Sequence, residues 1–382
     1  MQLRYQYRVY PTLAQQDALA QAFGCARVVF NDSLRLREDT HAAGARISDT
    51  DVQKQVVTTA KKTPQRAWLA EVASVVLVQA CQDARRAYRN WFDSLSGKRK
   101  GRKLGAPRFR SRKDRRQSIR LTRNGFRVRS NRRLYVAKVG ELEVRWSRNL
   151  PSEASSVTII RDSSGRFFAS FVVAVDSAPL PATDSAVGID LGLATFAVLS
   201  NGKAITSPRF LRRAERTLRK AQHCLSRKQK GSSNRAKQRV RVAKAHANVA
   251  DSRRDWAHKQ STMIIRDNQA VFVEDLCIRG MARTRLAKSV HDAGWGMFTR
   301  MLEQKATRYG RVFGKVDRYY PSSQLCSTCG VCDGPKPLSN RVWECKACGA
   351  VHDRDLNAAI NIYAAGHAEW LNACGGAVSL SA

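Results

Sequence analysis

Three acidic residues, each beside an apolar segment, have the clearest capacity for chemistry in this chain. Asp190 follows Val-Gly-Ile, Glu274 follows Val-Phe-Val, and Asp355 stands at the start of an apolar helical pattern. Carboxylates that come from distant positions to neighbouring element ends can hold two divalent metal ions for phosphodiester hydrolysis. Oxygen ligands favour Mg²⁺ or Mn²⁺ over softer metals. The three acids therefore predict a metal-dependent nuclease centre.

Each acid, considered alone, also has an ordinary structural explanation. Asp190 could lie in water at its strand end or accept hydrogen bonds from nearby backbone amides. Asp355 could stabilise a helix N-terminus, and Asp353 could serve as the cap equally well, because helical spacing does not separate the two. Asp275 points to the opposite strand face from Glu274 and is a weak candidate. Two strand-end acids together favour function, since a divalent ion removes the cost of bringing like charges together.

Four cysteines form the most specific local motif. Two residues separate Cys326 from Cys329 and Cys345 from Cys348, and fifteen residues lie between the pairs. This spacing is typical of a zinc ribbon, in which four thiolates complete the coordination of Zn²⁺ and the metal is structural. Cys332 has the same spacing from Cys329, so the first pair has an alternative.

The charge of the chain predicts a polyanionic partner. Lys and Arg outnumber Asp and Glu by 68 to 31, which gives a formal net charge of +37. Phosphate neutralisation with counterion release usually drives binding by such proteins. Residues 96–133 contain a single acid, Asp114, among many cations. Apolar residues alternate with these cations, so we expect strands of a small basic domain that grips a phosphate backbone, with candidate contacts at Arg108, Arg110, Arg112 and Lys113.

Apolar periodicity predicts the elements of the first half. Residues 3–9 alternate like a strand, and Thr12 is a plausible N-cap for the helix that follows. A second helix is expected over residues 65–95, with an aromatic stripe that packs in the core rather than binding a ligand. Further strands are expected at 134–144, 156–160 and 166–175.

The second half predicts an α/β core. Strands are expected at 186–191, 195–200 and 203–206, with a hairpin turn at Asn201-Gly202. A long basic helical stretch then extends to about residue 268. Three antiparallel strands followed by helix-flanked strands indicate an RNase H-like core. The later elements are a strand at 270–274, a helix from Trp295 to Tyr309 that Gly310 stops, a strand at 311–316 and a helix at 356–364.

Nothing in the sequence predicts a membrane or secretory location. The chain opens directly into polar sequence without a signal peptide. The longest apolar run, residues 72–81, is far shorter than the roughly 20 residues that a spanning helix needs. We therefore expect a soluble cytoplasmic protein, in which ten cysteines favour metal binding over disulfides.

Motifs along almost the whole chain resemble the TnpB family, the transposon-encoded RNA-guided nucleases related to type V CRISPR effectors. Their order and coverage make the resemblance specific. The motifs include Tyr7-Arg-Val-Tyr-Pro-Thr, Gly105-Ala-Pro-Arg-Phe-Arg-Ser-Arg, Gly188-Ile-Asp-Leu-Gly, Arg254-Asp-Trp-Ala-His-Lys, Tyr320-Pro-Ser-Ser-Gln-Leu-Cys-Ser-Thr-Cys-Gly and Asp353-Arg-Asp-Leu-Asn-Ala-Ala-Ile-Asn-Ile.

The resemblance implies a multidomain α+β fold with an RNase H-like (RuvC) nuclease core and an inserted zinc ribbon, preceded by a wedge-like β-barrel with an inserted helical recognition domain. The third catalytic acid of the family's pattern matches Asp355, and Gln79 falls in a helix that resembles the surface next to the target-adjacent motif. The implied boundaries are 1–10 and 96–180 for the barrel, 11–95 for the recognition domain, 181–320 and 351–368 for the nuclease, 321–350 for the ribbon and 369–382 for a tail.

The resemblance also implies an activity and its partners. The chain would bind one guide RNA from its own element, as a monomer. It would then recognise a short target-adjacent motif in double-stranded DNA and cleave both strands at a metal-dependent site. The alternative is a nuclease-inactive RNA-guided repressor, which the presence of all three acids disfavours. Two further interpretations remain. The acids also fit a transposase that joins DNA strands, and the charge and the cysteines also fit a plain zinc-ribbon RNA-binding protein.

Overall fold

The structure is a computed structural model that describes residues 1–337 and 339–373. The chain forms two compact units, Met1–Asp176 and a second unit that begins at Ser177. None of the described helices is long and apolar enough to cross a membrane. The last part of the expected tail, 374–382, lies outside the described residues.

An antiparallel seven-stranded sheet forms the centre of the first unit. In its first strand Tyr5, Tyr7 and Val9 are buried while the residues between them are more exposed, so the alternating sequence sets which face joins the core. The sheet order is β2-β6-β7-β1-β5-β4-β3. The strands are β1 (Gln2–Tyr10), β2 (Gln117–Thr122), β3 (Phe126–Val128), β4 (Leu134–Val136), β5 (Gly140–Arg145), β6 (Ala154–Arg161) and β7 (Phe167–Ala174).

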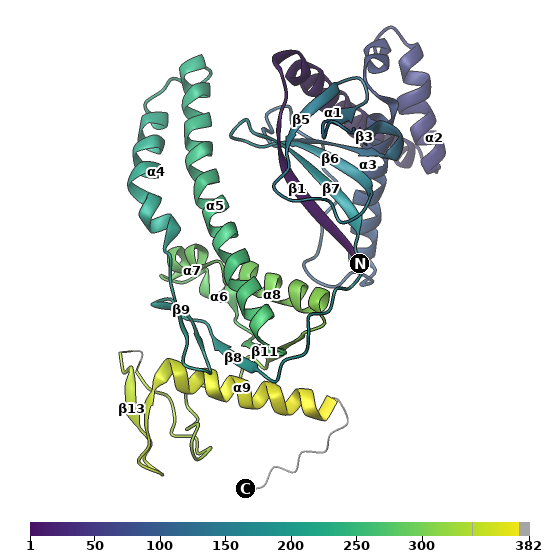
Figure 1. Cartoon of the computed structure of the whole chain (residues 1–382). Coiled ribbons are helices and arrows are strands. Elements are labelled where there is room, and N and C mark those ends of the chain that lie inside the picture. Colours follow the sequence, from purple (N-terminus) through teal and green to yellow (C-terminus); the bar gives the residue numbers. More distant parts are fainter. Residues whose placement is uncertain (338, 374–382) are drawn as a thin grey trace. The chain divides into compact units, whose positions relative to one another are not determined.

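Helices occupy the chain between β1 and β2 and share one hydrophobic core with the sheet (Figure 1). The predicted cap is confirmed: the Thr12 side chain accepts a hydrogen bond from the Gln15 backbone, and the Gln15 side chain accepts one from the Thr12 backbone. The helical elements are α1 (Leu13–Ala42), α2 (Asp49–Gln53), η1 (Lys54–Thr59), η2 (Ala60–Lys62), η3 (Ala67–Glu71), α3 (Ser74–Leu95) and η4 (Arg123–Gly125).

The structure differs from three expectations for this unit. The helix expected over 65–95 is broken, because Val72 adopts an extended backbone that allows both Leu69 and Val72 to reach the core. The strands expected within 96–133 form at 117–122 and 126–128 but not in 96–116, where Phe109 is 47% exposed with the Arg35 guanidinium over its ring. The aromatic stripe of α3, expected to pack in the core, leaves it near the C-terminal end of the helix, where Phe92 is 55% exposed.

A five-stranded sheet forms the centre of the second unit, in the order β10-β9-β8-β11-β12. The first three strands in sequence pair antiparallel, and β11 lies parallel to both β8 and β12. This arrangement agrees with the predicted RNase H-like core. The strands are β8 (Ala186–Asp190), β9 (Thr195–Leu199), β10 (Ala204–Thr206), β11 (Ala270–Glu274) and β12 (Val312–Val316).

Helices cover both faces of this sheet (Figure 1). The predicted basic helical stretch is two helices, because the chain turns at 227–232 and Ser232 caps the second. The predicted helix of 295–309 is confirmed, whereas the last helix is longer than the predicted 356–364. The helices are α4 (Phe210–Ser226), α5 (Ser233–Asp267), α6 (Ile278–Met281), α7 (Ala287–Ala293), α8 (Trp295–Tyr309) and α9 (Arg354–Ala373), and β13 (Val342–Glu344) pairs with β14 (Val351–Asp353).

Strand alternation assigns the two faces of the five-stranded sheet. Val187, Ile189, Val271 and Val273 pack with α5 and α8 in one hydrophobic cluster. Phe272 points to the opposite face, where it packs with residues of α9. The next residue of each strand on that opposite face is an acid, so the helix packing already determines where the acids point.

Candidate metal centres

Asp190 and Glu274 lie at the ends of adjacent parallel strands on the same face of the sheet. The register pairs Ile189 of β8 with Val273 of β11, and the next residue of each strand is the acid. Both acids are partly buried. The Leu191 backbone N–H donates to Glu274 Oε1 at 3.4 Å, which links the two strand ends directly.

Helix α9 brings the third acid to this edge. A Cβ at Gly188 would lie 2.3 Å from the carbonyl oxygen of Ala359, so only glycine allows α9 to lie so close to β8. Asp353 caps the helix, because its Oδ1 accepts a hydrogen bond from the Leu356 N–H at 2.9 Å. Asp355 is left free of that role and raises the pKa of Asp190, so the two carboxylates sense each other.

The electrostatics of this site favour a bound cation. Burial, followed by the charges of Glu274 and Asp355, raises the pKa of Asp190 to about 8. Burial raises the pKa of Glu274 to about 7, against the opposing effect of the Leu191 N–H. A divalent ion compensates the charge of grouped carboxylates, and it thereby lowers their raised pKa values and stabilises the ionised forms. The three acids therefore fit the hard cations that the sequence predicts.

An arginine of the cysteine-rich segment contacts this acidic site. Arg341 Nη1 donates to both carboxylate oxygens of Asp355 at 3.1 Å. Among the described residues, only the cysteines form a group of ligands close enough to share one ion. The three acids lie near one another but do not form so tight a group.

Asp275 belongs to a different environment from Glu274. Its carboxylate pairs with Arg318, and the Arg318 Nε also donates to the Asp275 carbonyl oxygen at 3.1 Å. This acid is thus already neutralised by a partner. It serves as a natural comparison for the neighbouring Glu274.

The four cysteines converge on one point. The Sγ atoms of Cys326 and Cys348 are 3.7 Å apart, as are those of Cys329 and Cys345, and all four lie within 4.8 Å of one another. A tetrahedral Zn²⁺ site with Zn–S bonds of about 2.3 Å places its sulfurs about 3.8 Å apart. The cluster therefore fits zinc. Cys332 is not part of the cluster. Its backbone pairs with that of Leu325 in an isolated antiparallel β-bridge.

Two matching turns position these thiolates. The backbone N–H of Gly330 donates to the Cys326 carbonyl, and that of Gly349 donates to the Cys345 carbonyl, both at 2.8 Å. Each glycine has a positive φ near +72°, as the turn after a Cys-x-x-Cys pair requires. His352 Nε2 lies 3.0 Å from Cys326 Sγ and orients that ligand.

The thiolate form of Cys326 is stabilised by its surroundings. Burial acts to raise its pKa, but the backbone amides of Cys329 and Thr328 and the His352 side chain lower it to about 5. A thiolate at neutral pH is the form that binds metal.

Two asparagines of α9 tie the ribbon to the helix that carries Asp355. Asn357 accepts a hydrogen bond from the Ser327 N–H at 2.9 Å and donates to the Leu325 carbonyl at 2.7 Å. Asn361 donates to the Ser322 carbonyl at 2.8 Å. Sequence reasoning missed both roles. The signal was available, because polar residues at i and i+4 within an apolar helix call for polar partners.

The candidate nucleic-acid contacts of the first unit differ in solvent exposure and in the contacts that they already make. Gln79 is half-buried on α3, whereas the side chains of Arg108, Arg112 and Lys113 are exposed. Arg110 is engaged within the unit: its guanidinium lies 3.8 Å from the centre of the Phe30 ring, and it pairs with Asp83. A phosphate contact by Arg110 would compete with these interactions.

A parallel sheet edge with gathered acids and an adjoining four-cysteine ribbon define the class of RNase H-like nucleases that carry a zinc ribbon. Three family models match the chain. They are described as a probable transposase (residues 170–285), a Cas12f1-like TNB domain (295–362) and a helix-turn-helix domain (1–46). Residues 1–46 fold here as β1 and the single helix α1, so they do not form two helices joined by a turn.

Similar proteins cover almost the whole chain. A Streptomyces pristinaespiralis protein named "Putative RNA-guided DNA endonuclease" is 43% identical over 97% of this chain and 90% of its own length. An Escherichia coli (strain K12) protein named "Putative RNA-guided DNA endonuclease InsQ" is 29% identical over 97% of this chain and 93% of its own length. The chain belongs to the TnpB family.

A solved structure supports the fold of the whole chain. The protein in "Cryo-EM structure of the Cas12f1-sgRNA-target DNA complex" has a TM-score of 0.61 to this chain. The match covers 95% of this chain and 98% of that one, at 13% sequence identity. At this identity the likeness concerns the fold alone.

Proposed function

We propose that this protein is an RNA-guided DNA endonuclease whose catalytic residues are Asp190, Glu274 and Asp355. The observation that carries the proposal is the meeting of these acids at one sheet edge, where the pKa of Asp190 rises to about 8. Its relatives described as RNA-guided DNA endonucleases match almost the full chain. The net charge of +37 suits a protein that holds RNA and DNA together.

The three carboxylates would hold Mg²⁺ or Mn²⁺. Bound there, the ions would activate a water for attack on the phosphodiester and stabilise the leaving 3′ oxygen. Asp190 would be the central ligand of the metal, and Glu274 and Asp355 would complete the set of carboxylates that holds it. Asp355 must first exchange its contact with Arg341 for the ion. The Arg341 side chain is then available for a phosphate beside the reacting strand.

The cysteine cluster would hold one structural Zn²⁺. Four thiolates leave no coordination position open for a substrate or water. The metal would instead fix the segment from which Arg341 reaches Asp355. Through Asn357 and Asn361, the same segment is attached to α9.

The other parts of the chain would share the work of nucleic-acid binding. We assign residues 1–10 and 96–180 to a wedge-like β-barrel, 11–95 to a recognition domain, 181–320 and 351–368 to the nuclease and 321–350 to the ribbon. Gln79 would read an adenine of the target-adjacent motif, since Gln can bond adenine bidentately. One chain would act with one guide RNA from its own element, in the cytoplasm or nucleoid, and cut both strands of the target duplex.

The test of this function is the RNA that accompanies the protein. The gene is expressed with its native flanking DNA, and the RNA that copurifies with the full chain is sequenced. One discrete species with a constant scaffold and a variable 3′ end supports a guided complex. A plasmid that matches that 3′ end should then be cleaved in Mg²⁺. A mixture of unrelated cellular RNAs, with no guided cleavage, would overturn the proposal.

A further inference from the structure

A cavity of about 580 Å³ lies within the first unit, where the C-terminal ends of α1 and α3 face each other. It belongs to neither metal centre. The residues that line it come from α1, the loop after α1, the last turns of α3 and the basic segment after α3. They are Arg37, Glu38, Thr40, His41, Ala45, Arg46, Ile47, Tyr88, Trp91, Phe92 and Ala106.

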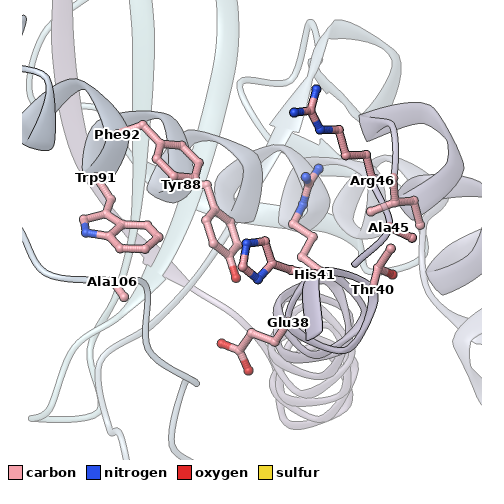
Figure 2. Close-up of a pocket in the computed structure, with 11 residues that line it drawn as sticks. Glu38, Thr40, His41, Ala45, Arg46, Tyr88, Trp91, Phe92 and Ala106 are labelled. Atoms are coloured by element: carbon pink, nitrogen blue, oxygen red, sulfur yellow. The ribbon is translucent and has the colours of Figure 1, made fainter. Parts of the chain in front are cut away.

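Three aromatic rings of α3 form one wall of this cavity (Figure 2). The rings of Trp91 and Phe92 are stacked with centroids 5.0 Å apart, and those of Tyr88 and Phe92 are stacked at 6.2 Å. Phe92 is 55% exposed, which is unusual for a ring that serves only the core. A cavity of this size and aromatic character suits a flat ligand of nucleobase dimensions.

Charge around the cavity indicates how such a ligand would be oriented. The segment 96–116, which contributes Ala106 to the wall, contains eleven Lys or Arg residues and one acid. All of these cations except Arg110 are exposed. Arg46, on the loop after α1, is exposed as well and lines the cavity. The rim therefore attracts phosphates, while the interior offers aromatic faces.

The cavity wall also offers a hydrogen-bond acceptor for a base edge, the exposed side chain of Glu38. Burial, and then the charge of Glu38, raises the pKa of the Tyr88 hydroxyl, so this carboxylate lies near the phenol. The Arg37 guanidinium, which pairs with Asp49, lies 5.7 Å from the Tyr88 centroid. Glu38 repels a phosphate but accepts N–H donors from a base. A nucleotide would thus enter with its base inward and its phosphate outward.

We propose that this cavity binds an unpaired nucleobase of the nucleic acid that the protein holds. The base stacks on Trp91 and Phe92, and the neighbouring phosphates contact the exposed cations of 96–116. The inference rests on the proposed function only in that the chain binds nucleic acid. It does not depend on cleavage. RNA and DNA strands share the chemistry that the cavity recognises.

The test uses the full chain without added divalent ions. Single-stranded RNA, single-stranded DNA and a DNA duplex, each of about twelve nucleotides and carrying one 2-aminopurine, cover the usual site size of such proteins. Phe92→Ser should weaken single-strand binding by about fivefold or more and relieve the quenching of 2-aminopurine. The salt dependence of binding should not change, because no phosphate contact is removed. Duplex affinity should stay at its wild-type value.

Leu95→Ser is the matched control. Leu95 is an exposed apolar residue of the same helix but does not line the cavity, so its variant should bind like the wild type. Trp91→Leu, checked for folding by circular dichroism, should repeat the loss seen with Phe92→Ser. A loss confined to RNA assigns the cavity to the guide, and a loss confined to DNA assigns it to an opened target strand.

Wild-type binding and quenching in both Phe92→Ser and Trp91→Leu would overturn the base-binding proposal. The nuclease proposal would be untouched by that result, since its test is cleavage by Asp190 variants. Conversely, undiminished cleavage by Asp190→Asn would remove the proposed catalytic site while the cavity result stood.

Discussion

The two candidate metal centres of the second unit are built in opposite ways. The cysteines come from one short segment, and two matching turns place their sulfurs at the spacing of a tetrahedral ion. The acids come from β8, β11 and α9, and only sheet register and helix packing bring them together. The first centre is therefore determined locally. The second depends on the whole fold of the unit.

The two centres also differ in how their charge is compensated. In the cysteine cluster backbone amides and His352 lower the pKa of Cys326 to about 5, while burial and the neighbouring thiols raise that of Cys348. At the acidic edge burial and mutual repulsion raise the pKa of Asp190 to about 8. Arg341 links the centres, because it reaches from the cysteine-rich segment to Asp355. The ribbon is thus expected to stabilise the fold, whereas the acids are expected to need their ions.

The largest expected effect separates Glu274 from its neighbour. Glu274→Gln keeps the shape of the side chain but removes the charge, so cleavage should fall by about 10²–10³-fold or more. Asp275→Asn is the matched control, since Asp275 pairs with Arg318 and not with the other acids. Its rate should stay within about twofold of wild type. Single-turnover cleavage of a guide-matched duplex measures both, and equal losses would contradict the assignment.

The zinc ribbon should affect cleavage by positioning Arg341 and Asn357, and not by taking part in the reaction. Cys345→Ser should lose zinc and release Arg341 and Asn357 from their places, with cleavage reduced about 10- to 100-fold. RNA binding should be retained. Zinc content by atomic emission and cleavage rate are measured on the same preparation. Cys332→Ser should keep both zinc and activity, and a loss of zinc in that variant would mean that the ligand set is different.

Arg341 should compete with divalent ions for Asp355. Partly exposed ion pairs contribute about 0.2–1 kcal/mol, so Arg341→Ala should tighten Mn²⁺ binding by up to about fivefold. Lys346→Ala, an exposed cation of the same ribbon, should change nothing. Mn²⁺ titration followed by electron paramagnetic resonance gives the affinity. Weaker Mn²⁺ binding in Arg341→Ala would show that the arginine positions Asp355 instead.

The smallest effect concerns stability and pH without divalent ions. The folded-state pKa values of Asp190 and Glu274, about 8 and about 7, lie above the ordinary carboxyl values. The folded state therefore keeps protons that the unfolded state loses, and stability should fall as pH rises from about 4 to 8. Asp190→Asn removes the larger of these contributions. Its Tm should exceed the wild-type value at pH 8 by about 2–4 °C, and by less at pH 5.

Calorimetry at the two pH values checks this sign. Asp275→Asn should show no such gain, because its carboxylate is already paired. A Tm of Asp190→Asn below that of the wild type at pH 8 would mean that the charged carboxylate stabilises the fold without an ion.

Local signals in the sequence predicted a large part of the second unit. Gly310 ends α8 where expected, and the Asn201-Gly202 turn joins β9 to β10. The apolar runs before Asp190 and Glu274 form strands, because their alternation matches a sheet covered on both faces. Asp190 and Glu274 could be predicted from their strand ends alone, whereas the choice of Asp355 over Asp353 at the start of α9 needed the family resemblance.

Non-local contacts explain what the sequence did not predict. The hairpin of β13 and β14 separates Arg341 from Asp355 in the sequence, so their spacing does not predict the ion pair. The helix breaks at Val72 because an extended backbone there allows both Leu69 and Val72 to pack in the core. In the basic stretch 96–133 the alternating residues 117–122 and 126–128 find pairing strands, whereas residues 96–116 have none. Pairing and packing partners decide such cases, and they lie elsewhere in the chain.

The most direct test of the account is to locate the ions. Crystals of the protein with its RNA are soaked in Mn²⁺, and anomalous scattering is measured at the manganese edge. The account predicts manganese within about 2.0–2.3 Å of carboxylate oxygens of Asp190 and Glu274, with Asp355 turned from Arg341 to a second ion. Manganese absent from these carboxylates in a preparation that cleaves DNA would contradict the central claim.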